Sequence, residues 1–201
     1  MNAPLRFSDI AADVAALLDH CQIMGPVILS GCAIGGGIAL QFALDYPTRT
    51  AAVVPLDPAL GTTPEGANGV RKLADLMAAE GMAAVEETLL AKTYPDRYRE
   101  RNPGHFAAVR GRWYANDPVS FAYYFRMLAD TDLVPQLGAI RCPVLFGAGL
   151  YDSFRPPAYV RYVADAVAGS RVVELDAGHH VPDHAPEAVC LLLQEALAVA
   201  S

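Results

Sequence analysis

Short apolar segments alternate with longer segments in which apolar residues recur at helical spacing along most of this chain. Four segments have the length and apolar character of buried strands: 27–29, 51–56, 142–146 and 171–175. The intervening patterns predict helices from about residue 8, from the turn after Gly31 to about Tyr46, over 157–167 and over 186–199. Strands that are apolar throughout and alternate with helices are typical of a parallel sheet covered on both faces. The pattern therefore predicts an α/β fold.

Two helix boundaries have specific signals. Ser8 is expected to cap the first helix, in which Ile10, Val14 and Leu18 recur on one face. The helix after Gly31 is expected to end near Tyr46, because Pro47 follows and restricts the backbone of the residue before it.

The middle of the chain interrupts the alternation. Residues 61–140 show helical patterns and no convincing strand, and this insertion is too long for an ordinary connection between parallel strands. We interpret residues 1–60 and 141–201 as the core and 61–140 as a helical lid over the end of the sheet where α/β proteins bind ligands. Within the lid, Trp113, Tyr123 and Tyr124 form either its packed interior or a wall of the substrate site.

Composition and charge narrow the classes of function. The 201 residues are 53% hydrophobic with a formal net charge of −7, and no run of lysine or arginine interrupts the acidic balance. This argues against nucleic acid and anionic membranes as partners. No apolar run reaches the ~18 residues needed to span a bilayer. The four cysteines are widely spaced without a CxxC pair, as in a reduced cytoplasmic protein.

The segment "GCAIG", residues 31–35, has the G-x-Nu-x-G spacing of a nucleophile elbow, a strained strand-to-helix turn whose tip is flanked by tiny residues at −2 and +2. Only Ala33 satisfies both flanks. Cys32 at the tip would place isoleucine at +2, and Ser30 would place isoleucine at −2. The tip therefore holds alanine, which has no nucleophilic atom.

Two other glycine-rich motifs do not match this segment. A dinucleotide fingerprint starting at Gly35 would need glycine where Leu40 stands, and a P-loop would need lysine at Gly37. A tight strand-to-helix packing turn without a function stays open on spacing alone.

Two later loops supply an acid and a base in the order that such hydrolases use. Asp152 lies just beyond the strand at 142–146, and His179 lies just beyond the strand at 171–175. Asp57, after the strand at 51–56, is an alternative acid or a simple turn residue. His180 and His184 are expected to be surface or supporting polar residues, and their spacing predicts no metal site.

Together these stretches closely resemble the α/β-hydrolase superfamily, and more narrowly the group containing 3-oxoadipate enol-lactonases, cofactor-free haloperoxidase-type esterases and aminoacrylate hydrolases. The carriers are "GCAIGGGIALQFALDYPTR", "DTDLVPQLGAIRCPVLFGAGLYDSFRPP" and "LDAGHHVPDHAPEAV". The resemblance implies that His179 is the general base, that Asp152 orients it, and that the N–H of Ile34 lines the oxyanion hole. It implies no cofactor.

This sequence departs from the family pattern in two ways. Most members carry serine where this chain has Ala33. Some aminoacrylate-hydrolase-like members carry alanine there, so a natural variant is one explanation. A serine-to-alanine substitution introduced to trap a ligand is the other, because it would give the same sequence. Members also have several strands ahead of the segment at 27–29. Without them that strand would expose an apolar edge, so we expect a truncated product, a partial sequence, or a homo-oligomer or partner chain that covers the edge.

The sequence thus predicts a hydrolase of a small lactone, activated ester or enamine, with His179 and Asp152 as its base pair and Ala33 at the nucleophile position. The alternative is a non-catalytic protein that binds a small molecule, or an inactive fragment of a hydrolase.

Overall fold

The computed structural model describes residues 4–200 and divides into two compact units. One unit contains Arg6–Leu60 and Leu133–Ser201 and carries the sheet. The other contains Gly61–Asp132, together with the first residues of the chain, and is helical. The role of the helical unit as a lid stays a prediction.

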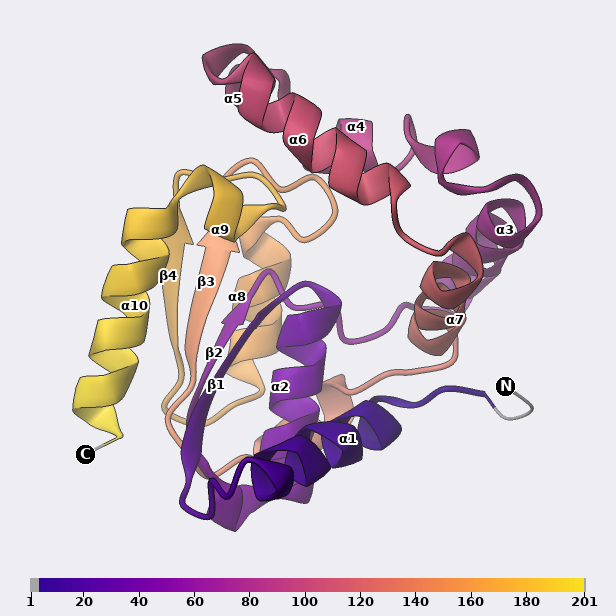
Figure 1. Cartoon of the computed structure of the whole chain (residues 1–201). Coiled ribbons are helices and arrows are strands. Elements are labelled where there is room, and N and C mark those ends of the chain that lie inside the picture. Colours follow the sequence, from indigo (N-terminus) through magenta and orange to yellow (C-terminus); the bar gives the residue numbers. More distant parts are fainter. Residues whose placement is uncertain (1–3, 201) are drawn as a thin grey trace. The chain divides into compact units, whose positions relative to one another are not determined.

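A four-stranded parallel sheet forms the centre of the first unit, which confirms the predicted α/β fold. Its strands lie side by side in chain order: β1 (Val27–Cys32), β2 (Thr50–Leu56), β3 (Leu145–Gly149) and β4 (Arg171–Leu175). In Figure 1, α10 (Pro186–Val199) covers one face, and α2 (Ile34–Asp45) and α8 (Pro157–Asp165) cover the other. Because the strands are parallel, their carboxyl ends meet at one edge of the sheet.

Each face of the sheet has its own apolar core. On the α10 face, Leu56 and Leu175 pack with Leu192 of the helix, and all three are almost fully buried. On the other face, Phe42 of α2 packs against α1 (Phe7–His20) and the partly buried Leu29. These layers explain why the two central strands, β2 and β3, carry almost only apolar residues and glycine, since both of their faces are removed from water.

Strand β1 lies at one end of the strand order, and within residues 4–200 no further strand pairs with its outer edge. Its residues 27–29 are only partly buried, whereas most of β2 is buried. The expectation that a partner covers this edge stays a prediction.

Several boundaries differ from the sequence prediction, and those of α1 and β3 have a clear physical cause. Helix α1 begins at Phe7, so Ser8 lies inside it; the preceding Arg6 is the N-cap, and its backbone N–H donates to Asp9 Oδ2 at 3.0 Å. Strand β3 starts three residues later than the run at 142–146 suggested, because Pro143 has no N–H to donate to a ladder. It continues through Gly147 and Gly149, whose lack of side chains hid the strand from a pattern of apolar residues.

The helical unit contains five α-helices in the part of the chain that the structure describes, and no strand, as the sequence indicated. They are α3 (Pro64–Glu80), α4 (Leu90–Thr93), α5 (Asp96–Arg101), α6 (Pro103–Tyr114) and α7 (Pro118–Ala129). Helices α3 and α7 pack together and are joined by an Arg126–Asp75 ion pair at 2.8 Å. An isolated bridge between Gly61 and Asp132 joins the two ends of the unit.

Within residues 61–140, where the sequence shows helical patterns, the stretch that contains Val85, Leu89 and Leu90 does not form one continuous helix. It divides into a 3-10 turn, Met82–Val85, and the short α4. Across residues 4–200, none of the helices is both long enough and apolar enough to pass through a bilayer.

Candidate active site

Each of the four adjacent strands delivers one residue to the carboxyl edge of the sheet. Ala33 follows β1, Asp57 follows β2, and the loops after β3 and β4 carry Asp152 and His179. One ligand-type atom from each of Asp57, Asp152 and His179 lies within 4.8 Å of the other two. The strand order therefore gathers at one place residues that are far apart in the sequence.

Ala33 sits at the tip of a strained strand-to-helix turn. Its φ of 52° and ψ of −116° are rare for a residue with a side chain. Backbone hydrogen bonds from β2 and the loop after it hold this conformation: Ala33 N–H donates to the Leu56 carbonyl at 2.9 Å, and Ala59 N–H donates to the Ala33 carbonyl at 2.9 Å. This is the backbone shape expected of a nucleophile elbow, with a methyl group at its tip.

The glycines beside the tip are not equivalent. A Cβ on Gly31 would lie 2.3 Å from the carbonyl carbon and 2.4 Å from the carbonyl oxygen of Gly35. A Cβ on Gly35 would meet nothing within 4 Å. The elbow pattern predicted tiny residues at both flanks, but in the structure only the −2 position is crowded.

Ile34 is the first residue of α2, directly after the tip. Backbone N–H groups in the first turn of a helix have no partner inside the helix, so they are available to a negatively charged oxygen. This is where the sequence placed an oxyanion donor.

Asp152 and His179 form a direct hydrogen-bonded pair. Nδ1 of His179 lies 2.6 Å from Oδ2 of Asp152, and the Asp152 side chain is fully buried while that of His179 is 17% exposed. Burial tends to raise the pKa of Asp152, but the hydrogen bond from His179 and backbone N–H groups of Arg155 and Phe154 outweigh it and lower the pKa below its usual value. An ionised Asp152 fixes the proton on Nδ1, which leaves Nε2 to accept another.

Asp57 is the residue whose importance sequence reasoning underestimated. It is 0% exposed and has a positive φ of 41°. Its Oδ1 accepts the backbone N–H of Gly149 at 2.9 Å. Burial, and then the charge of Asp152, raise the pKa of Asp57 to about 8. The signal in the sequence was its place directly after an apolar strand.

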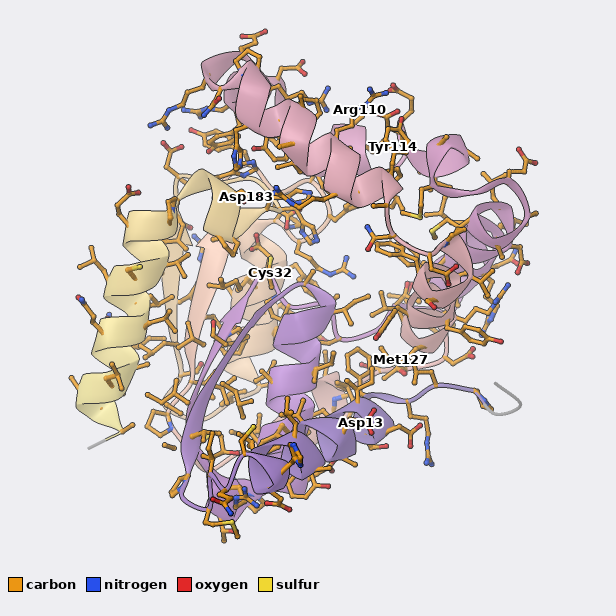
Figure 2. All side chains as sticks on the ribbon, in the orientation of Figure 1. Asp13, Cys32, Arg110, Tyr114, Met127 and Asp183 are labelled. Atoms are coloured by element: carbon orange, nitrogen blue, oxygen red, sulfur yellow. The ribbon has the colours of Figure 1, made fainter. Side chains whose placement is uncertain are left out.

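Cys32, next to the elbow tip, does not have the properties of a nucleophile. Its Sγ lies 3.1 Å from the backbone carbonyl of His179, to which the thiol donates. Burial and the nearby charge of Asp57 raise its pKa to about 12, so the reactive thiolate is scarce at neutral pH. Figure 2 shows Cys32 on the same end of the sheet as Asp183, which belongs to the short α9 (Val181–His184).

The neighbouring histidines support the loop that carries His179. His184 is 8% exposed, and its Nδ1 accepts the backbone N–H of Gly178 at 3.0 Å. His184 is therefore a supporting residue and not a surface residue. Burial lowers the pKa of His180 to about 4, so its ring is neutral at pH 7.

The predicted aromatic residues belong to the helical unit. Trp113 of α6 is buried, and Tyr123 and Tyr124 of α7 are partly buried. Figure 2 labels the neighbouring Arg110 and Tyr114, which hydrogen-bond each other at 2.9 Å. A role for Trp113, Tyr123 and Tyr124 as a substrate wall stays a prediction.

The spacing of Asp57, Asp152 and His179 distinguishes a metal site from a hydrogen-bonded network. Ligand atoms around a tetrahedral zinc ion lie roughly 3.3 Å apart, given bonds of about 2.0–2.1 Å. The 2.6 Å separation between His179 and Asp152 is shorter and matches a charge-assisted hydrogen bond. The three residues fit a proton-sharing network better than a metal site.

One family model and several solved structures match this chain over most of its length. The family model described as serine aminopeptidase, S33 (Hydrolase_4) matches residues 4–180. An esterase from Thermogutta terrifontis has a TM-score of 0.89 and 26% identity, covering 100% of this chain and 75% of its own. The enol-lactonase from Burkholderia xenovorans LB400 has a TM-score of 0.88 and 26% identity, covering 98% of this chain and 75% of its own.

Two relatives in sequence are also named as hydrolases or lactonases. The 3-oxoadipate enol-lactonase 2 of Acinetobacter baylyi is 26% identical over 88% of this chain, which spans 65% of that relative. The putative carbamate hydrolase RutD of Klebsiella pneumoniae is 27% identical over 76% of this chain, and the match spans 58% of that relative. The chain therefore corresponds to only part of each of these two proteins.

Proposed function

This chain belongs to the serine aminopeptidase S33 (Hydrolase_4) family and has the α/β-hydrolase fold, and from this premise we propose that it hydrolyses a small, activated carbonyl compound. The compound is a lactone or an activated ester, or it is an enamine, which becomes the corresponding C=N electrophile when it tautomerises to an imine. The hydrogen-bonded pair of His179 and Asp152 carries this proposal, because it gives a base at the strand ends that can take a proton from water.

The proposed mechanism needs no covalent intermediate, since Ala33 cannot form one. Nε2 of His179 removes a proton from a water molecule, and the resulting hydroxide adds to the carbonyl carbon, or to the C=N carbon of an enamine in its imine form. Backbone N–H groups at the start of α2, beginning with Ile34, stabilise the oxyanion. The bond to the leaving group then breaks, and the leaving group takes the proton from His179, while Asp152 stabilises the charged ring in between.

The expected rate sets the substrate class. Loss of the nucleophile in a serine triad removes on the order of 10⁶ in kcat and leaves roughly 10³ over water from binding and the oxyanion hole. Such a rate suits a substrate with a good leaving group and does not suit an ordinary ester. The relatives are named for enol-lactone and carbamate hydrolysis, and both are small carbonyl electrophiles.

A direct test compares the natural chain with His179→Ala on a small enol lactone and a small aryl ester. We expect measurable hydrolysis that falls to the buffer rate in His179→Ala. Ala33→Ser is the matched gain-of-function variant, and it is expected to raise kcat on the aryl ester and to show a burst of acyl-enzyme. Equal rates for the natural chain and His179→Ala would refute the proposal.

Ala33 itself favours a second candidate, a non-catalytic protein that retains the fold for binding small molecules. This candidate predicts saturable binding of the lactone or its hydroxy acid by calorimetry, with no turnover above buffer. Under it, His179→Ala changes binding and leaves the rate of hydrolysis unaffected.

A further inference from the structure

Asp57 and Asp152 are two carboxyl groups in one buried space, and they differ in the hydrogen bonds that they receive. The Asp152 carboxylate accepts from Nδ1 of His179 at 2.6 Å and from the backbone N–H of Phe154 at 2.7 Å, and the N–H of Arg155 adds a further bond. Asp57 accepts from one backbone N–H, that of Gly149. Negative charge is therefore far better stabilised on Asp152.

The second carboxyl oxygen of Asp57, Oδ2, has no hydrogen-bond partner within residues 4–200 although it is buried. One carboxylate oxygen of Asp152 lies within 4.8 Å of one oxygen of Asp57. Two ionised carboxylates at this separation have no proton to share. An unpaired buried acceptor is costly, so the ionised form of Asp57 does not account for this arrangement.

We propose that Asp57 is a positioning residue that stays protonated at neutral pH and donates a hydrogen bond from Oδ2 to the Asp152 carboxylate. The pair then holds one proton and one negative charge, as expected for two close carboxyl groups. The donated bond fixes the orientation of the carboxylate that in turn holds His179.

The groups around Asp57 come from the ends of several strands and from the loops that follow them. The charged and titratable groups that face it are Asp152, His179, Cys32 and Arg155. A Cβ on Gly149 would lie 2.8 Å from Asp57 Oδ2 and 2.9 Å from the carbonyl of Gly178, so glycine lets the end of β3 approach both. Of these groups, Asp57 is the least exposed, and its anion would accept the fewest hydrogen bonds. We therefore assign the expected pH dependence of unfolding to Asp57.

The inference rests on the proposed function only for its consequence, which is that Asp57 acts on catalysis through Asp152 and His179. The protonation of Asp57 and its bond to Asp152 are measurable in a protein with no activity at all. The first experiment therefore observes the carboxyl group directly, by carbon-13 NMR of labelled aspartate from pH 5 to pH 10, with Asp57→Asn to assign its resonance.

We expect the Asp57 carboxyl carbon to have the shift of a protonated acid at pH 7 and to titrate near pH 8. A carboxylate shift for Asp57 at pH 6 to 7 would overturn the proposal. This measurement uses the natural chain, so it decides the question even if an Asp57 variant fails to fold, in which case the resonance is assigned through its own backbone.

The second experiment measures unfolding in urea across the same pH range for the natural chain and Asp57→Asn. Asparagine copies the protonated acid, with an oxygen for Gly149 and an N–H₂ for Asp152, and it tolerates a positive φ. The native Asp57 keeps its proton while the unfolded chain loses it, so the natural chain loses stability as pH rises toward 8. The ratio of its unfolding constant to that of Asp57→Asn should increase by up to about tenfold per pH unit, and should level above pH 8.

Asp13→Asn is the matched control, because it removes an exposed aspartate from α1 of the same unit. Its unfolding constant should follow that of the natural chain at every pH. Parallel curves for the natural chain and Asp57→Asn would contradict the proposal, as would a pH dependence equally abolished by Asp13→Asn.

The link to His179 has its own measurement. We expect the downfield Nδ1 proton resonance of His179 to be retained in Asp57→Asn and to be lost or broadened in Asp57→Ala, which cannot donate to Asp152. With a substrate that the natural chain hydrolyses, Asp57→Asn should have a kcat/KM within about threefold of the natural value at pH 7. Asp57→Ala should lower kcat/KM more than tenfold. Rescue by the asparagine supports a positioning role, and an unchanged proton resonance in Asp57→Ala would refute it.

Discussion

The crowding at Gly31 gives a sharp test of the elbow. Replacement by alanine would put a Cβ 2.3 Å, 2.4 Å and 2.9 Å from the C, O and Cα atoms of Gly35, whereas ordinary contact begins near 3.4 Å. All three atoms belong to the backbone at the start of α2, so no side-chain rotation can relieve the contact. Gly31 has no positive φ, so this contact is the only cost that we assign to the change.

The magnitude follows from the shortfall of roughly 1 Å. Overpacking of this kind typically costs about 1–3 kcal/mol, and rigid neighbours favour the upper end of that range. Replacing glycine also restricts the unfolded chain, which offsets about 0.4–1 kcal/mol. We therefore expect Gly31→Ala to lower the free energy of unfolding by about 2 kcal/mol, which corresponds to a loss of about 4–8 °C in Tm for a chain of this size.

Gly35→Ala is the matched control, because the same change four residues away meets no atom within 4 Å. Alanine is up to about 1 kcal/mol better than glycine in a helix, so this variant should be neutral or more stable. Urea unfolding followed by circular dichroism measures both variants against the natural chain. Equal stability of Gly31→Ala and Gly35→Ala would refute the one-sided geometry of the turn.

Three further predictions concern stability elsewhere in the chain. Asp117 caps α7 by accepting the N–H of Ser120 at 2.7 Å, so Asp117→Ala should lower the free energy of unfolding by about 1 kcal/mol, measured by urea unfolding with Asp117→Asn as control. Phe146 is fully buried in β3, and Phe146→Ala should cost about 3–5 kcal/mol in the same assay; a cost below about 1 kcal/mol would contradict its place in the core. The lowered pKa of Asp152 means that its contribution is present above pH ~4 and is lost as pH falls further, so Asp152→Asn should flatten the stability curve below pH 4.

Much of the sheet could be predicted from local pattern, because a strand buried on both faces must be apolar. That reasoning predicted the central strand β2 to within one residue, and the short apolar run 171–175 predicted the edge strand β4 with its observed bounds, although Arg171 and Glu174 are exposed. It predicted β3 but misplaced both ends, because Pro143 delays the ladder and Gly147 and Gly149 extend it without an apolar side chain. Ser8 was misplaced because a serine near a helix start is only one of several capping solutions, and the Arg6–Asp9 pair supplies another.

The sequence by itself determined which residues follow the strands, and hence that Ala33, Asp152 and His179 would lie along one edge of the sheet. It determined the position of the elbow tip, because glycine spacing is a local property of the backbone. The relation between Asp57 and Asp152 was decided only by the tertiary structure. These residues are 95 positions apart, and they meet because β2 lies beside β3 and burial removes both from water. Strand order and the loss of solvent belong to the folded chain as a whole, so the sharing of one proton between two acids has no signature in the sequence around either one.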